Sequence, residues 1–230
     1  MIYCMSDLHG ERDLFERMLE QIGFSEEDHL YIIGDVIDRG RGGVAMLEQI
    51  MDSPNMTMLL GNHEKMCLAV LGPRHALGGR ELWRQNGDRS TYRDLIYRRT
   101  PQARFRILHF LAGLPDHLDL TVNGRAFHLI HDCPGDDPEE RIWGRIEPHS
   151  VSPYPDTLCL VGHTPTSFLT GAEDADLSIW HGDGILDIDC GCGHLREPHR
   201  RLACLRLDDL TEFYVGGMEP PSGPPDRSPT

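Results

Sequence analysis

The sequence predicts an α/β fold in which two β-sheets form a two-layer β-sandwich flanked by helices. Through the first two-thirds of the chain, short aliphatic runs alternate with segments of helical spacing, an order typical of βαβ units with parallel strands. After Gly162 the pattern changes to apolar runs joined by tight turns, which predicts antiparallel strands. At 230 residues, the chain is long enough to bury a core without disulfide bonds.

Strands are predicted where short apolar runs are bounded by Gly, Asp or His. The five early runs are Ile2–Met5, Leu30–Ile33, Met56–Leu60, Ala126–Ile130 and Leu158–Val161, and the later three are Ile185–Asp189, Arg201–Leu207 and Glu212–Val215. Helical spacing predicts helices over Glu11–Ile22, with Leu14, Met18 and Leu19 on one face, and over Gly43–Met51.

Residues 1–217 are predicted to form one domain. Within it, 65–112 is too long for a plain loop, so we expect a helical insertion that Gly72–Gly79 interrupts. The last thirteen residues, 218–230, contain five prolines and no aliphatic cluster, which predicts a disordered Pro-rich tail.

Composition excludes several classes of protein. The net charge of −15 and the single lysine, Lys65, argue against a general nucleic-acid binder, because a phosphate backbone requires clustered cations. No apolar run approaches the roughly 18 residues of a membrane span, so no membrane partner is expected. Seven cysteines cannot all pair, and no secretory signal precedes Ser6, which predicts a reduced, cytoplasmic protein.

Potential metal ligands follow each of the five early strands. In parallel sheets, ligands collect at the carboxyl ends of strands, and an Asp-x-His pair in extended chain points both side chains the same way. The candidate ligands are Asp7, His9, Asp35, Asn62, His131 and His163. Six ligands are too many for one ion but suit two ions that share a carboxylate, and Asp35 is the natural bridge. Each short motif alone is more typical of a solvated loop; their ordered occurrence together predicts a dinuclear site at the strand ends.

The same residues lie in motifs that resemble the signature series of the phosphoprotein phosphatase family, within the calcineurin-like metallophosphoesterases. The resemblance is closest to small bacterial and phage members and extends over about Ile2 to Val215. It rests on Ser6-Asp7-Leu8-His9-Gly10, Gly34-Asp35-Val36-Ile37-Asp38-Arg39-Gly40, Gly61-Asn62-His63-Glu64, Gly162-His163-Thr164-Pro165, Trp83-Arg84-Gln85-Asn86-Gly87 and Trp143-Gly144-Arg145. Ser6 stands where the family usually has Gly.

The resemblance implies a role for each matched residue. Asp7, His9 and Asp35 would hold the first metal, and Asp35, Asn62, His131 and His163 the second. His63 would be the general acid, oriented by Asp38. Arg39 and Arg145 would grip the phosphoryl oxygens, although Arg141 competes for the role of Arg145. Substrate contacts would come from Arg39, Asn62, His63 and Arg145. The expected cofactors are two divalent ions, Mn²⁺ first, with Fe or Zn as alternatives.

These assignments predict a metal-dependent phosphomonoester hydrolase in which a metal-bridging hydroxide attacks phosphorus. The favoured substrates are phosphoproteins or phosphopeptides, phosphorylated on serine or threonine, with phosphotyrosine left open. The alternative is a symmetrical dinucleoside polyphosphate hydrolase, whose members usually have Asp where this chain has Glu64. A set of arginines favours that alternative: Arg74, Arg80, Arg84, Arg89 and Arg93. A catalytically inactive binding module is disfavoured, because no ligand is missing.

Two further clusters are not assigned to the site. Cys190-Gly191-Cys192 lacks a second cysteine pair and is predicted to be structural. His181 and Asp183 precede a strand, and a surface position is favoured over an approach to the site.

Overall fold

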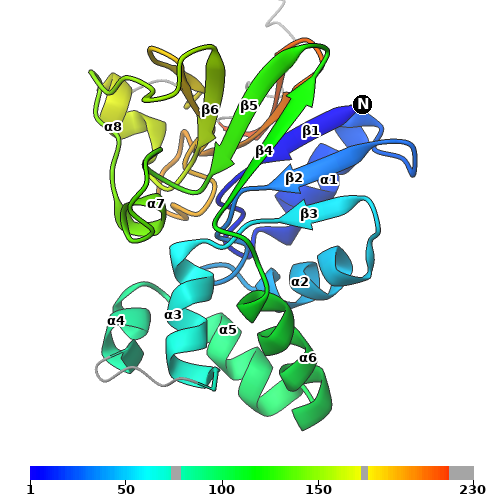
Figure 1. The fold of residues 1–230 in the computed structure, drawn as a ribbon. Coiled ribbons are helices and arrows are strands. Elements are labelled where there is room, and N and C mark those ends of the chain that lie inside the picture. Colours follow the sequence, from blue (N-terminus) through cyan, green and yellow to red (C-terminus); the bar gives the residue numbers. More distant parts are fainter. Residues whose placement is uncertain (74–78, 172–175, 218–230) are drawn as a thin grey trace, which may run out of the picture.

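Two five-stranded sheets pack face to face in the computed structural model, which describes residues 1–73, 79–171 and 176–217 (Figure 1). The first sheet has the strand order β10-β9-β1-β2-β3 and the second β4-β5-β6-β8-β7. The predicted fold class is confirmed. Residues 218–230, predicted to be a disordered tail, lie outside the described residues.

Eight of the ten described strands begin and end within two residues of a predicted one, and β4 and β7 were not predicted. They are β1 (Ile2–Met5), β2 (His29–Ile32), β3 (Met56–Met58), β4 (His117–Val122), β5 (Arg125–Ile130), β6 (Thr157–Val161), β7 (Trp180–His181), β8 (Ile185–Asp187), β9 (Arg201–Arg206) and β10 (Thr211–Gly216). The helices are α1 (Arg12–Ile22), α2 (Gly43–Asp52), α3 (Asn62–Leu71), α4 (Gly79–Gln85), α5 (Arg89–Arg93), the π-helix η1 (Asp94–Arg98), α6 (Pro101–Ala112), α7 (Glu140–Trp143) and α8 (Thr166–Thr170).

Both sheets are mixed. In the first, β1, β2 and β3 run parallel, and β9 and β10 are antiparallel, as expected. Strand β8, predicted to be antiparallel like β9 and β10, lies in the second sheet instead, where it is parallel to β6 and antiparallel to β7. Strands β7 and β8 form an antiparallel pair, so the chain that runs back along β7 returns along β8 in the direction of β6.

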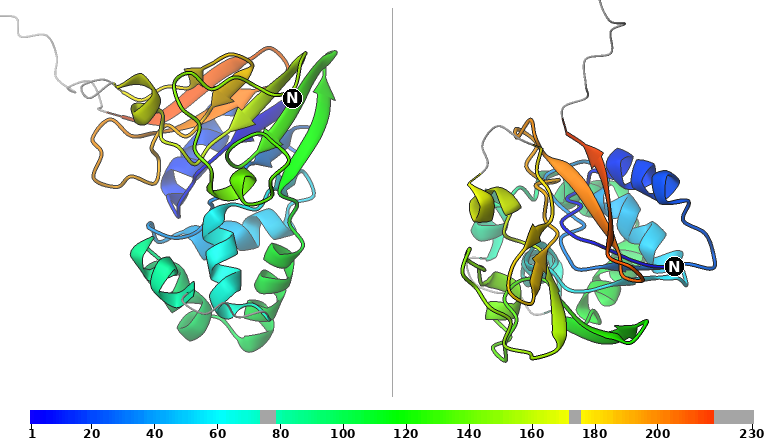
Figure 2. Two further views of the ribbon diagram at one scale, coloured as in Figure 1. Left: turned by 60° about the vertical axis from the view of Figure 1, so that its left-hand side comes forward. Right: turned by 90° about the horizontal axis from the view of Figure 1, so that it is seen from above.

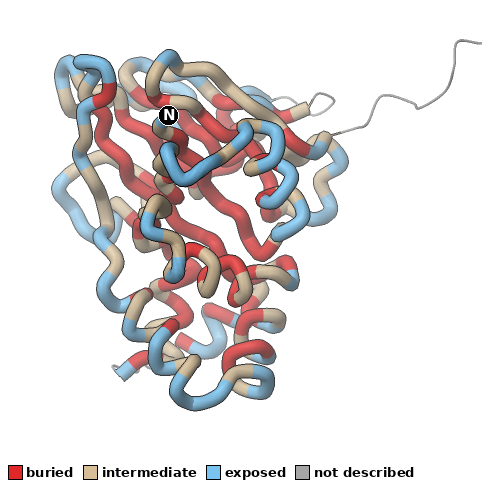
Figure 3. The backbone as a smooth tube through the Cα atoms, turned by 90° about the vertical axis from the view of Figure 1, so that its right-hand side faces the viewer, coloured by how far each residue is buried: buried red, intermediate tan, exposed pale blue. Residues whose placement is uncertain are grey.

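The core between the sheets comes from the facing side chains of both. Cys4 and Leu205 of the first sheet pack in one cluster with Phe127, Leu129 and Leu160 of the second. Figure 3 shows this as continuous buried segments along the strands. A second cluster joins the outer face of the first sheet to α1 and α2. The two views of Figure 2 show these helices on one side of the sandwich.

Helices α3 to α6 occupy the segment predicted to be a helical insertion, although residues 74–78 are not described. They gather below the sheets in Figure 1. The first of them begins at Asn62, three residues before the predicted start of the insertion. Two predicted site residues, Asn62 and His63, therefore lie on the first turn of α3.

Strand β4 is absent from the sequence prediction. It forms a hairpin with β5, and Asn123 and Gly124 at the turn have φ angles of +49° and +81°. Asn-Gly between two strands is a strong signal for a two-residue hairpin turn, because both residues tolerate positive φ. The alternating segment before Asn123 could therefore have been recognised as a strand.

Candidate metal centre

The six predicted ligands meet where the carboxyl ends of strands from both sheets converge. Asp7 and His9 follow β1, Asp35 follows β2, and Asn62 begins α3 just after β3. The second sheet contributes His131 after β5 and His163 after β6. In Figure 1 the arrowheads of β1, β2 and β3 point toward the start of α3, where this site lies.

Asp35 lies between two groups of ligands. Its Oδ2 is 3.6 Å from Nε2 of His9, and its Oδ1 is 3.5 Å from Nε2 of His131. Asp7 joins the first group, with Oδ1 3.8 Å from Nε2 of His9. Asn62 Oδ1 lies 3.2 Å from His131 Nε2, and His163 has a ring nitrogen within 4.8 Å of the ligand atoms of Asp35 and His131. This is the arrangement that a shared carboxylate between two ions requires.

The hydrogen bonds of two histidines indicate whether the ligand atoms of this site could bind a cation. His9 donates from Nδ1 to the Ile37 carbonyl at 3.1 Å, and His131 from Nδ1 to the Ile33 carbonyl at 2.8 Å. With Nδ1 as the donor, the neutral form of each ring has its lone pair on Nε2, facing carboxylate or amide oxygens that also cannot donate. Burial and the nearby Arg39 lower the pKa of His9 well below its usual value, so its ring stays neutral. Such converging acceptors are satisfied by a metal ion, and this mixed N/O donor set suits Mn, Fe or Zn.

The backbone that carries these ligands is strained. Among the described residues, positive φ occurs at nine non-glycine positions, and six belong to the predicted site: Asp7, His9, Asp35, Asp38, Arg39 and His163. Left-handed conformations cost about 1–3 kcal/mol each and persist at functional sites, where the surroundings enforce them. The sequence argument that Asp7 and His9 align in extended chain is therefore wrong. They have φ angles of +52° and +42°, and a left-handed turn brings them together.

Comparisons with known proteins agree with this geometry. The family model described as calcineurin-like phosphoesterase matches residues 1–200. The chain belongs to this family. It is 30% identical over 146 residues to serine/threonine-protein phosphatase 2 of Escherichia coli strain K12, covering 63% of this chain and 62% of that protein. It is also 41% identical over 71 residues to a symmetrical bis(5'-nucleosyl)-tetraphosphatase of Acidovorax sp. strain JS42, covering 30% of this chain and 25% of that protein.

Solved structures show the same fold at low sequence identity. A protein serine/threonine phosphatase of Saccharomyces cerevisiae, with similarity to human PP5, superimposes with a TM-score of 0.64 and 11% identity. The match covers 96% of this chain and 81% of the yeast chain. The matched segments span a quarter to about three-fifths of the length of the two curated relatives named above.

Glu64, which the sequence analysis used to choose between branches of this family, does not face the cleft. It is fully buried, and its carboxylate accepts hydrogen bonds from the backbone N–H groups of Asp35 at 2.9 Å, Val36 at 3.0 Å, Ile37 at 3.3 Å and Gly61 at 3.2 Å. Glu64 thus clamps the loop that carries Asp35 against the start of α3. Its side chain positions a ligand and does not contact a substrate.

We therefore expect Glu64→Asp to reduce stability without altering substrate preference. The shorter side chain cannot reach every N–H, and an unsatisfied buried donor costs about 1–3 kcal/mol. Chemical denaturation measures the stability, and the ratio of kcat/KM for a phosphopeptide to that for diadenosine tetraphosphate measures preference. A variant of unchanged stability whose ratio shifts toward the nucleotide would contradict this role.

His63 is held by a buried chain of hydrogen bonds. Its Nδ1 donates to Asp38 Oδ2 at 2.7 Å, and the same oxygen accepts from Trp83 Nε1 at 2.6 Å. Burial alone would lower the pKa of His63, but the charges of Asp35 and Asp38 outweigh it and raise that pKa. Nε2 of His63 faces the site, 3.8 Å from Asp35 Oδ2 and 3.4 Å from Arg39 Nη2. The imidazole is therefore placed to deliver a proton there. The sequence analysis noted Trp83 by resemblance but gave it no role.

The structure places the two candidate arginines, Arg145 and Arg141, in different surroundings. Arg145 lines the cleft over the ligands, a cavity of about 630 Å³ that Arg39 and Asn86 also line. Arg141 lies elsewhere, where it donates to the Gly135 carbonyl at 2.7 Å and to Asp116 at 3.3 Å. Arg145 is the arginine that a substrate in the cleft can reach.

Two residues of the site were missed by the sequence analysis. Asp132 is fully buried, neither carboxylate oxygen has a hydrogen-bond partner among the described residues, and Oδ2 lies 3.3 Å from His163 Nε2. Burial raises the pKa of Asp132 to about 8. A carboxyl group beside a candidate histidine ligand orients the ring, and its position directly after His131 was the available signal. His194, in the turn after Cys192, lines the cleft with Arg39.

The residues left out of the predicted site stay outside it. Cys190 and Cys192 are buried free thiols, and burial raises both pKa values, so the thiols are unreactive. His181 is exposed and lies 2.7 Å from Glu212 Oε1, away from the cleft.

No helix among the described residues is long and apolar enough to cross a membrane.

Proposed function

We propose that this protein is a metal-dependent phosphomonoester hydrolase that acts on phosphorylated proteins or peptides. The observation that carries the proposal is a cleft lined by Arg39 and Arg145 over two groups of candidate ligands that share Asp35, with Nε2 of His63 3.8 Å from Asp35 Oδ2. Asp7, His9 and Asp35 would hold one ion, and Asp35, Asn62, His131 and His163 the other. When bound, the ions supply a water nucleophile at neutral pH and neutralise phosphoryl charge.

The protein's own residues would carry the rest of the reaction. Arg39 and Arg145 bind the phosphoryl oxygens, a task for which guanidinium geometry is suited. As the water oxygen bonds to phosphorus, the ester P–O bond breaks and His63 Nε2 gives its proton to the leaving oxygen, and the proton that the water loses to solvent is matched by one that His63 takes up from solvent. Asp38 fixes the His63 ring through Nδ1, and Trp83 fixes Asp38 in turn.

Arg145→Lys tests the phosphoryl contact. Lysine keeps the charge but loses the fork, and a charge-assisted hydrogen bond is worth about 1.5–3 kcal/mol, so kcat/KM should fall about 10- to 100-fold. Arg141→Lys is the matched control on the same segment, and its kcat/KM should stay near that of the wild type. Steady-state kinetics on one phosphopeptide decides between them, and the reverse ranking would place Arg141 at the substrate.

The choice of phosphoprotein rests on two supports. The similarity to the Escherichia coli protein phosphatase extends over 146 residues, about twice the length of the match to the tetraphosphatase. The chain also carries a net charge of −15, which repels extended polyanions outside the cleft. Glu64 gives no support to either substrate class, because its side chain does not reach the cleft.

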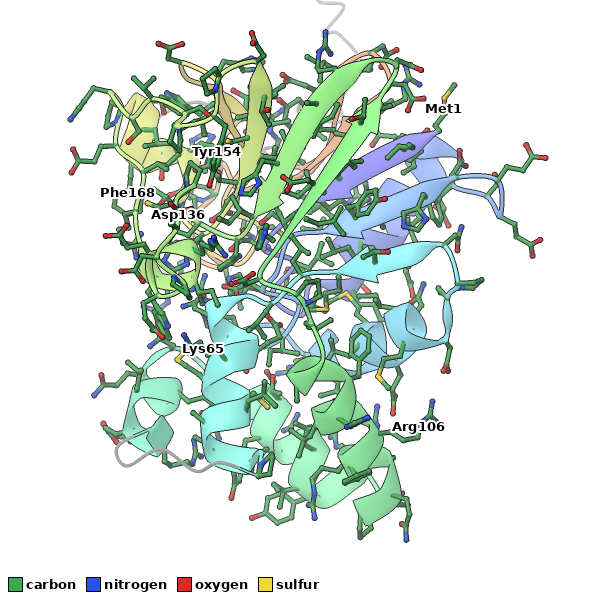
Figure 4. The ribbon with its side chains drawn as sticks, in the orientation of Figure 1. Met1, Lys65, Arg106, Asp136, Tyr154 and Phe168 are labelled. Carbon is green, nitrogen blue, oxygen red and sulfur yellow. The ribbon has the colours of Figure 1, made fainter. Side chains whose placement is uncertain are left out.

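A dinucleoside polyphosphate is the second candidate, and one observation favours it. The far wall of the cleft is apolar, and Phe168, 68% exposed on α8, lies on that wall (labelled in Figure 4). An exposed ring beside two arginines is suited to stacking a nucleobase.

The test compares kcat/KM for phosphoserine, phosphothreonine and phosphotyrosine peptides with that for diadenosine tetraphosphate at one Mn²⁺ concentration. The proposal expects the best phosphopeptide to exceed the nucleotide. If the nucleotide is preferred, and Phe168→Ala weakens it while Phe105→Ala, an equally exposed ring on α6, does not, the second candidate replaces the first.

A further inference from the structure

The loop that connects β8 to β9, residues 188–200, borders the cleft and is held at both ends. Near its end, Arg200 Nη2 lies 2.8 Å from Glu11 Oε2, on the chain that follows β1. In its middle, a Cβ atom added to Gly193 would collide with the ring of His9, one of the candidate metal ligands. The backbone of the loop therefore packs directly against the candidate metal centre, and these contacts set its position.

The tip of this loop presents Arg196. The Glu197 N–H donates to the His194 carbonyl at 2.8 Å, which closes a four-residue turn with Leu195 and Arg196 at its central positions, and both of these residues are exposed. Arg196 has no ion pair or hydrogen bond within the described part of the chain. Ten other arginines there, Arg141 among them, pair with a carboxylate. The charge of Arg196 is therefore available to a ligand.

Arg196 lines a cavity that adjoins the cleft. This smaller cavity has a volume of about 470 Å³, and Arg39 and His194 line both it and the cleft. A substrate whose phosphoryl group is bound by Arg39 can therefore extend past that side chain toward Arg196. Glu197 also lines the smaller cavity, and its Oε1 accepts a hydrogen bond from the His199 N–H at 3.1 Å, so the loop itself engages this carboxylate.

The charged residues that line only one of the two cavities differ in sign. Arg196 adds a second guanidinium to that of Arg39 in the smaller cavity, against the one carboxylate of Glu197. Glu147 lines the cleft beside its apolar wall and does not line the smaller cavity. Because the chain carries a net charge of −15, an acidic peptide residue is attracted only where cations are locally in excess. The Arg196 side of the cleft meets that condition, and the Glu147 side does not.

We propose that Arg196 binds an acidic side chain of the substrate, one to three residues from the phosphorylated residue and on one side of it only. This inference rests on the proposed function, since it names the class of phosphopeptide that the cleft prefers. Successive residues of an extended peptide advance about 3.3 Å, so the next few residues are those that reach the adjoining cavity when Arg39 binds the phosphoryl group. Arg196 acts on substrate binding and not on the chemical step.

Matched phosphoserine peptides test the proposal. Each pair has three aspartates in one member and three asparagines in the other, placed before the phosphoserine in one pair and after it in the second. For the wild type, KM should be about three- to fivefold lower for the acidic member of one pair only, the effect of a solvent-exposed ion pair. Equal KM values within both pairs would overturn the proposal and leave the proposed function standing. If none of the peptides is hydrolysed, the proposed function fails, and this inference fails with it.

Charge reversal distinguishes a substrate contact from a structural effect. On the preferred side, Arg196→Glu should reverse the order, so that a peptide with three lysines has a lower KM than the peptide with three aspartates. Arg17→Glu makes the same change of charge at an exposed arginine of α1 that lines neither cavity, and it should keep the wild-type order. An acidic preference that survives in Arg196→Glu would overturn the proposal. The same reversal in Arg17→Glu would do so as well, because it would indicate a general effect of net charge.

Discussion

Replacing His63 with Asn should slow turnover of alkyl phosphate esters by about 10²- to 10⁴-fold, the usual contribution of a general acid. An alkoxide leaves poorly without a proton, and Nε2 of His63 faces the site, while its Nδ1 is held by Asp38. The loss should be smaller for aryl esters, whose leaving groups need less protonation. Kinetics on a phosphoserine peptide and on an aryl phosphate measure both effects.

Metal content provides the control for this variant. His63 is not among the six proposed ligands, so His63→Asn should retain both ions under conditions that saturate the wild type. Equal losses for alkyl and aryl esters would exclude His63 as the acid. Loss of an ion would instead make His63 a ligand, a role open to it because Nε2 lies 3.8 Å from Asp35 Oδ2.

Asp35→Asn should abolish activity and metal binding together. The two oxygens of Asp35 face His9 and His131 separately, so this is the one carboxylate that both ligand groups share. The amide oxygen can still accept the His63 backbone N–H that Asp35 Oδ1 accepts at 3.0 Å, and the metal-free chain should stay folded. Metal analysis after saturation and thermal unfolding of the metal-free chain measure these two results.

The matched control is Asp52→Asn on α2, whose side chain is 72% exposed. It should bind metal and turn over substrate as the wild type does. If Asp35→Asn retained two ions at wild-type affinity, the shared-carboxylate arrangement would be wrong. A wild type that binds at most one ion at saturation would exclude the dinuclear centre itself.

Much of the fold follows from local pattern. The aliphatic runs that form β5 and β6 lie between Gly, Asp or His residues, so the ends of these strands could be placed within a residue or two. Whether a strand runs parallel or antiparallel to its neighbours could not be predicted with the same success. The run at Ile185–Asp187 resembles the runs of the antiparallel strands β9 and β10, yet it pairs in parallel with β6 and antiparallel with β7, because pairing depends on the path of the connection and not on the run.

The identities of the candidate ligands were available from the sequence because chemistry and spacing recur after each strand. The sequence did not show why these ligands lie close together in space. Asp7 and His9 converge through left-handed backbone held by neighbouring loops, with His9 N donating to the Asp35 carbonyl at 2.9 Å. No pattern of residue types encodes such a conformation, because tertiary hydrogen bonds balance its local cost.

The sequence by itself determined which residue types stand at the ends of which strands, and hence a phosphoesterase-like set of ligands, acid and arginines. Only the tertiary structure decided how they are used. It placed Glu64 beneath the candidate ligands and out of the cleft, put Arg145 and not Arg141 on the lining of the cleft, and brought Trp83 and Asp132 close to candidate site residues. The physical reason is that roles depend on burial and on partners distant in the chain, whereas a sequence pattern records only near neighbours.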